Sequence, residues 1–119
     1  LERNSSTEIL TNAVKNALSA NPDIRGFYSA GAGITALLGL LQKFDLTEDT
    51  FVIAHDLTPQ TRAGLEDETI DAVISQDVGH MVRSAIRVLK AISDGTEIDP
   101  AQELIRIDIV LKENLFNWN

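Results

Sequence analysis

The chain contains no cysteine among its 119 residues, and it is poor in aromatic and basic side chains. Without cysteine, disulfide bonds, thiolate metal sites and a cysteine nucleophile are excluded. No apolar run approaches the roughly 18 residues that a membrane span needs, and no segment resembles a secretory signal. The 18 acidic residues outnumber the 10 basic ones, which argues against a nucleic-acid-binding surface in this segment. We therefore expect a cytoplasmic protein with no membrane contact.

The composition that remains is that of a soluble globular domain. Apolar residues make up 44% of the chain and charged residues 24%, which is ordinary for such a domain. The length suffices for one modest hydrophobic core. Because the chain begins at Leu1 and its single methionine is Met81, we expect a fragment of a longer protein.

Strand and helix patterns alternate along the chain. An alternating pattern of isoleucine and polar residues predicts that the last strand is half exposed and lies at a sheet edge. The strands then join helices in right-handed βαβ units, which predicts an α/β fold of three layers, α/β/α, with a mainly parallel sheet. The predicted strands are residues 24–30, 51–56, 72–76 and 105–111. A helix is predicted at 34–44, and its apolar residues on nearly every side predict burial all round, either inside its own domain or partly against a partner.

Helix boundaries follow from capping residues. Ser5 and Glu8 have the spacing of a capping box, which predicts that the first helix begins there. Thr58, followed by proline, and Asp77 are typical N-caps for two later helices. Gly95 is expected to end the last helix.

Polar side chains stand where two consecutive strands end, at Asp56 and Gln76. In an open parallel sheet, ligands bind beyond the carboxyl ends of the strands, so both side chains should face one crevice. A carboxylate accepts hydrogen bonds and an amide both donates and accepts, which suits a hydroxyl-rich ligand. The alternative is structural, because an aspartate often caps the following helix and a glutamine can bond to the backbone.

A glycine-rich turn joins the predicted strand at 24–30 to the next helix. Its sequence, from Gly31 and Ala32 to Ala36, matches the G-x-G-x-x-A fingerprint of dinucleotide-binding proteins, so its helix N-terminus could hold a phosphate. A whole helix precedes the motif, however, and Asp56 lies farther on than the roughly 20 positions that the fingerprint expects. We favour a turn shaped by tight strand-to-helix geometry and keep a nucleotide-dependent α/β enzyme as an alternative.

Nothing in the sequence requires catalysis. The two histidines, His55 and His80, do not share a metal-ligand spacing. No G-x-S-x-G nucleophile elbow occurs. We therefore predict no catalytic residue, no metal, no cofactor and no enzymatic activity.

Residues 54–65 and 69–77, together with 21–26 and 107–115, resemble the C-terminal lobe of the periplasmic-binding-protein-like effector domain of LacI/GalR transcription regulators. The resemblance implies one lobe, residues 1–119, of a bilobed type I fold that clamps a ligand against a second lobe. It implies that Asp56 and Gln76 hydrogen-bond sugar hydroxyls. The family often has Asn-Asp at a turn where this chain has Gly31 and Ala32, which removes two polar contacts from the cleft.

The resemblance also implies a function. This lobe would sense a sugar or polyol effector and modulate DNA binding through an N-terminal domain outside this chain, in a homodimer built partly on the helices after residues 34 and 58. Sugar-binding proteins of ABC transporters share the same lobe. A transporter solute-binding protein is therefore the first alternative, and the nucleotide-dependent enzyme is the second.

Overall fold

A computed structural model describes residues 2–31 and 33–117, and the chain divides into two compact units. Unit 1 comprises Leu1–Ile74 and Ile109–Asn119, and unit 2 comprises Ser75–Asp108. No helix in the described ranges combines the length and the apolar character of a membrane span.

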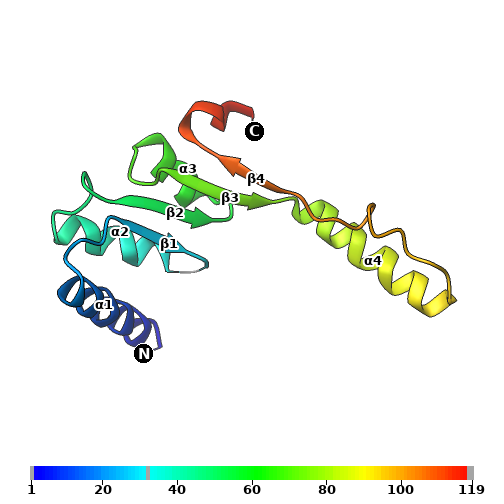
Figure 1. The fold of residues 1–119 in the computed structure, drawn as a ribbon, viewed down its shortest axis with the longest axis horizontal. Coiled ribbons are helices and arrows are strands. Elements are labelled where there is room, and N and C mark those ends of the chain that lie inside the picture. Colours follow the sequence, from blue (N-terminus) through cyan, green and yellow to red (C-terminus); the bar gives the residue numbers. More distant parts are fainter. Residues whose placement is uncertain (1, 32, 118–119) are drawn as a thin grey trace. The chain divides into compact units, whose positions relative to one another are not determined.

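Helices and strands alternate as the sequence predicts (Figure 1). The four strands form one sheet in the order β1-β2-β3-β4, in which β1 pairs with β2 and β2 with β3 in parallel. An α/β fold with a mainly parallel sheet is therefore confirmed, and β4 lies at the edge. The elements are α1 (Glu2–Ala20), β1 (Gly26–Ser29), α2 (Ile34–Lys43), β2 (Phe51–His55), α3 (Pro59–Glu66), β3 (Ala72–Gln76), α4 (Val78–Asp94), β4 (Ile107–Val110) and the 3-10 helix η1 (Lys112–Asn117).

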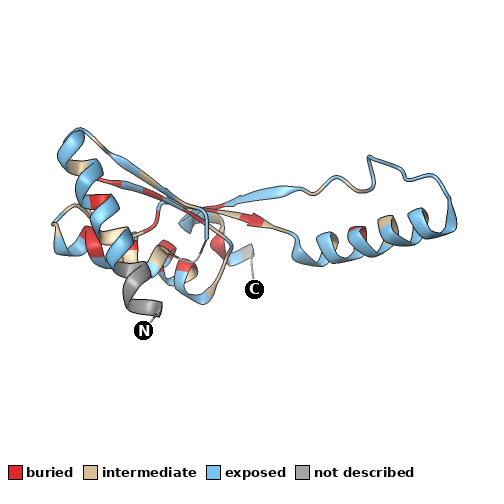
Figure 2. Ribbon diagram, turned by 90° about the horizontal axis from the view of Figure 1, so that it is seen from below, coloured by how far each residue is buried: buried red, intermediate tan, exposed pale blue. Residues whose placement is uncertain are grey.

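The core of unit 1 lies on one face of the sheet. Successive side chains of a strand point to opposite faces, so Val52 and Ala54 of β2 are buried while Phe51 and Ile53 are exposed. Buried and exposed segments follow one another along the strands (Figure 2). Helices α1, α2 and α3 all pack on the buried face, and the third layer predicted for the other face stays a prediction. The buried apolar core is Val14, Leu37, Leu40, Leu41, Val52, Ala54, Leu65, Ile70, Val73, Val110 and Leu115.

Three predicted helix boundaries are confirmed. The Thr58 hydroxyl accepts a hydrogen bond from the Thr61 N–H at 3.2 Å, and the Thr61 hydroxyl accepts one from the Thr58 N–H at 2.8 Å. The Asp77 carboxylate accepts from the His80 N–H at 2.7 Å and so caps α4. Gly95 ends α4 in the left-handed conformation, with φ of 66°.

One boundary prediction is wrong, and one burial prediction is met only in part within this chain. Helix α1 begins at Glu2, so Ser5 stands inside the helix and does not begin it. Within this chain α2 is not buried all round, because Gly39 is exposed whereas Leu37 and Leu41 are buried, and burial of its exposed side against a partner stays a prediction. One face of α2 buries Leu37, Leu40 and Leu41, and Leu38 is half-buried.

In β4 the structure decides which side chains face the core. Val110 is fully buried, whereas Ile107 and Ile109 are each 60% exposed. The alternating pattern predicts that alternate side chains share a face of the strand. It does not predict which face meets the core, because isoleucine and valine both suit a buried site.

Candidate functional site

A cavity of about 340 Å³ lies at the carboxyl end of β2, next to the N-termini of α2 and α3. Both helices belong to unit 1, as does every residue that lines the cavity. The strand end and the two helix starts place polar groups around it, among them Gly31, Thr35, His55, Asp56, Thr58 and Gln60.

Asp56 is held in a defined backbone conformation. Its φ is 64°, in the left-handed region that aspartate tolerates better than most residues. The Asp56 N–H donates to the Ile74 carbonyl at 2.9 Å, and its own carbonyl accepts from the Thr61 hydroxyl at 2.7 Å. Because β3 and the first turn of α3 fix both sides of the peptide, the side chain projects from a rigid position.

The Asp56 carboxylate has no hydrogen-bond partner among the residues that the structure describes. It is exposed at the cavity, and α3 is capped by Thr58, so the alternative role of Asp56 as a helix cap is wrong. An ionised carboxylate with free lone pairs can accept hydrogen bonds from two hydroxyl groups. Asp56 is therefore available to a ligand.

Gln76 is the last residue of β3 and belongs to unit 2. The parallel register aligns His55 with Ile74, so β3 runs beside the end of β2 before it reaches Gln76. Its joint action with Asp56 on one ligand stays a prediction.

One position of the glycine-rich turn requires glycine because of its backbone conformation. Gly31 has φ of 131°, a region closed to other residues, although an added Cβ would meet nothing within 4 Å. Gly31 lines the cavity with backbone only, and Gly33 caps α2 without a side-chain hydrogen bond. Ala32, the other residue predicted at this turn, lies outside the described residues.

Sequence reasoning missed one pair at this cavity. The Tyr28 hydroxyl hydrogen-bonds His55 Nε2, and the two rings meet edge to face, 5.4 Å apart at 78°. Tyr28 comes from β1 and pairs in register with Ile53, two residues before His55. Only the register brings these side chains together, and the sequence gives no register.

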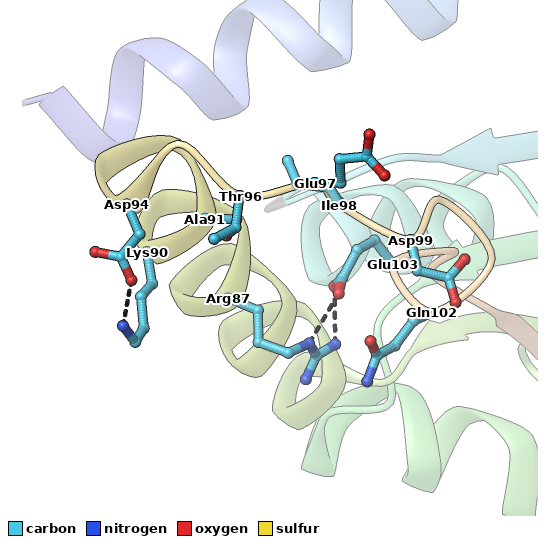
Figure 3. A pocket seen from close by; sticks show the side chains of 10 residues that line it. All are labelled: Arg87, Lys90, Ala91, Asp94, Thr96, Glu97, Ile98, Asp99, Gln102 and Glu103. Atoms are coloured by element: carbon cyan, nitrogen blue, oxygen red, sulfur yellow. Dashed lines mark hydrogen bonds and ion pairs between the residues drawn. The ribbon is translucent and has the colours of Figure 1, made fainter.

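A second cavity, of about 330 Å³, lies in unit 2 beside α4 (Figure 3). Both of its cationic side chains are paired: Arg87 donates two hydrogen bonds of 2.8 Å to Glu103, and Lys90 pairs with Asp94. Hydrogen bonds from Arg87 and then Ser84 lower the pKa of Glu103 from its usual 4.5 to about 2. Because Glu103 and Asp94 already have cationic partners, we interpret the Arg87–Glu103 pair as a structural contact that joins α4 to the loop that follows it.

Residues 2–97 match the sequence profile of a family described as the periplasmic binding protein domain. The chain belongs to this family. The match extends through both units and includes Asp56 and Gln76. This match confirms the periplasmic-binding-protein-like lobe that the sequence resemblance implied. The narrower assignment to LacI/GalR regulators stays a prediction.

Solved structures of this fold are similar to the chain. GanP, a glucose-galactose binding protein from Geobacillus stearothermophilus, is 21% identical with a TM-score of 0.74, over 88% of this chain and 38% of its own. An ABC transporter periplasmic solute binding protein from Actinobacillus succinogenes, with bound D-allose, is 22% identical with a TM-score of 0.74, over 94% and 39%. One from Agrobacterium vitis, bound with alpha-D-tagatopyranose, is 17% identical with a TM-score of 0.72, over 91% and 36%.

The chain thus spans less than two-fifths of the length of these three proteins. At these identities the likeness shows the fold. A search among curated protein sequences found no match.

Proposed function

We propose that this domain is the sugar-binding lobe of a larger receptor, with Asp56 as its principal polar contact and Gln76 as the second. The observation that carries the proposal is the Asp56 carboxylate, which is fixed through its backbone, exposed at a cavity and unpartnered among the described residues. A neutral sugar offers adjacent hydroxyl groups, and a carboxylate accepts hydrogen bonds from two of them. Of the three similar structures named above, one is a glucose-galactose binding protein and two hold a bound sugar, which supports this ligand class.

Among receptor types we favour the solute-binding protein of a sugar transporter. Two of the three similar structures are described as ABC transporter solute binding proteins, which favours this alternative over the regulator. In this case the full-length protein would carry an export signal and act outside the cytoplasmic membrane.

The effector domain of a LacI-type regulator is the second candidate. It is favoured by the sequence resemblance of residues 54–65 and 69–77, and it would place the protein in the cytoplasm as a homodimer with a separate DNA-binding domain. Sugar binding would then shift the population between two lobe arrangements. The sequence that precedes this segment in the full-length protein separates the candidates, because a helix-turn-helix supports the regulator and a signal peptide the transport receptor.

The ligand class is tested by calorimetry on the full-length protein with D-glucose, D-galactose, D-allose and D-tagatose. We expect saturable binding of at least one sugar and none of NAD. Asp56→Asn replaces one acceptor oxygen by an N–H donor, and Gln76→Ala removes the amide. Each variant should weaken binding by about 1–3 kcal/mol, because one ligand hydroxyl loses its hydrogen-bond partner.

Asp45→Asn is the matched control. Asp45 also has a positive φ, 58°, and an exposed side chain, but it does not line the cavity. It should leave affinity unchanged. Binding of NAD without any sugar would contradict the proposal and favour the nucleotide-dependent enzyme, and unchanged sugar affinity in both Asp56→Asn and Gln76→Ala would remove these residues from the site.

A further inference from the structure

The Tyr28–His55 pair places an ionisable ring, that of His55, at the cavity beside the carboxyl end of β2. His55 lines the cavity and is partly buried, and the Tyr28 hydroxyl occupies its Nε2 atom. Of the described residues that line the cavity, only His55 and Asp56 are ionisable. On the other side of β2, His55 pairs with Ile74 of β3, which carries no charge.

The protonation state of His55 decides which hydrogen bonds the pair can offer. A neutral imidazole has one N–H donor and one bare nitrogen, so the Tyr28 hydroxyl either donates to Nε2 or accepts from it. When the ring gains a second proton, both nitrogens become donors. Nε2 must then donate to the Tyr28 oxygen, which frees the hydroxyl hydrogen, and Nδ1 carries a proton as well.

When His55 is neutral, an ionised Asp56 provides the only full charge that a ligand meets among the described lining residues. A negative side chain repels an anionic ligand and accepts hydrogen bonds from a neutral one. Protonated His55, the neighbour of Asp56 in the chain, would offset this charge and add hydrogen-bond donors at the same cavity.

We propose that the Tyr28–His55 pair is a proton-controlled part of the ligand site that sets its selectivity between neutral sugars and sugar acids. The pair favours neutral sugars when His55 is neutral and admits a uronic acid when His55 is protonated. Histidine is the side chain whose charge ordinarily changes between about pH 5 and pH 8. This inference rests on the proposed sugar-binding function.

The test compares matched ligands on the full-length protein. Affinities for D-glucose and D-glucuronate, and for D-galactose and D-galacturonate, are measured by calorimetry at about pH 8 and about pH 5.5, on either side of the ordinary histidine range. We expect the affinity ratio of uronate to neutral sugar to rise about tenfold at the lower pH, equivalent to about 1.4 kcal/mol. The ratio cancels any general loss of folding or binding at acid pH.

Two variants assign the effect. His55→Gln keeps a hydrogen-bonding side chain but cannot gain charge, so its ratio should be the same at both pH values. Tyr28→Phe leaves His55 titratable but removes the hydroxyl, so its rise should be smaller than that of the wild type. Both readouts are ratios within one variant, so reduced stability alone would not reproduce them.

The outcomes separate this inference from the proposed function. If no neutral sugar of the wider panel binds at about pH 8, the proposed function fails, and this inference fails with it. If a neutral sugar binds and the uronate ratio does not rise at the lower pH, only the selectivity inference is overturned. A rise that persists unchanged in His55→Gln also overturns it, because the titrating group then lies elsewhere.

Discussion

Replacement of Gly64 by alanine should destabilise the protein through one defined clash. A Cβ at Gly64 of α3 would lie 2.6 Å from Ile70 Cδ1 and 2.8 Å from Ile70 Cγ1. Ile70 is 1% exposed, and its N–H donates to the Gly64 carbonyl at 2.9 Å, so neither its side chain nor its backbone has room to move. Overpacking of this kind costs about 1–3 kcal/mol.

Gly39→Ala provides the matched control. Gly39 also lies inside a helix, α2, but it is exposed and an added Cβ would meet nothing within 4 Å. Alanine is favoured over glycine inside a helix by about 1 kcal/mol, and both substitutions have this gain. Gly39→Ala should therefore raise the free energy of unfolding by about 1 kcal/mol. Because the propensity gains cancel, the two variants should differ by the clash alone, about 1–3 kcal/mol.

Urea unfolding followed by circular dichroism measures both free energies. If Gly64→Ala is as stable as Gly39→Ala, the close packing of α3 on Ile70 is refuted. A difference that appears only as a changed m-value would also contradict the argument, because a clash in the folded core should shift the midpoint.

Two further substitutions probe contacts that the structure defines. Thr58→Ala removes the N-cap of α3 and should lower the unfolding free energy by about 1 kcal/mol in a urea titration, and an unchanged midpoint would contradict the capping role. Glu103→Gln breaks the ion pair with Arg87 and should destabilise unit 2 near neutral pH. Because folding lowers the Glu103 pKa from 4.5 to about 2, this contribution is complete above the higher value and is lost as pH falls through the lower one. Thermal unfolding of the two proteins should therefore converge near pH 2, and a gap that persists there would show that the ion pair is not its source.

Local chemistry accounts for the elements that the sequence predicted well. The Thr58 hydroxyl, the Asp77 carboxylate and the left-handed glycine at Gly95 each act within a few residues of their own position. Such contacts depend on no distant part of the chain, so their outcome is readable without a structure. Asp56 was predicted as a ligand contact for a related reason, because the polar end of a parallel strand marks the ligand side of the sheet whatever the register. The structure places Asp56 at a cavity, and its ligand role stays a prediction.

By itself, then, the sequence determined the α/β class, the order of the elements, most of their boundaries and Asp56 at a strand end. Only the tertiary structure decided that Val110 faces the core while Ile109 does not, and that Tyr28 reaches His55. The same holds for the bidentate contact between Arg87 and Glu103, which joins a helix to a loop. These outcomes depend on strand register and on contacts between residues far apart in the chain. A period of two or of 3.6 residues specifies which side chains share a face, but packing against other elements specifies what that face meets.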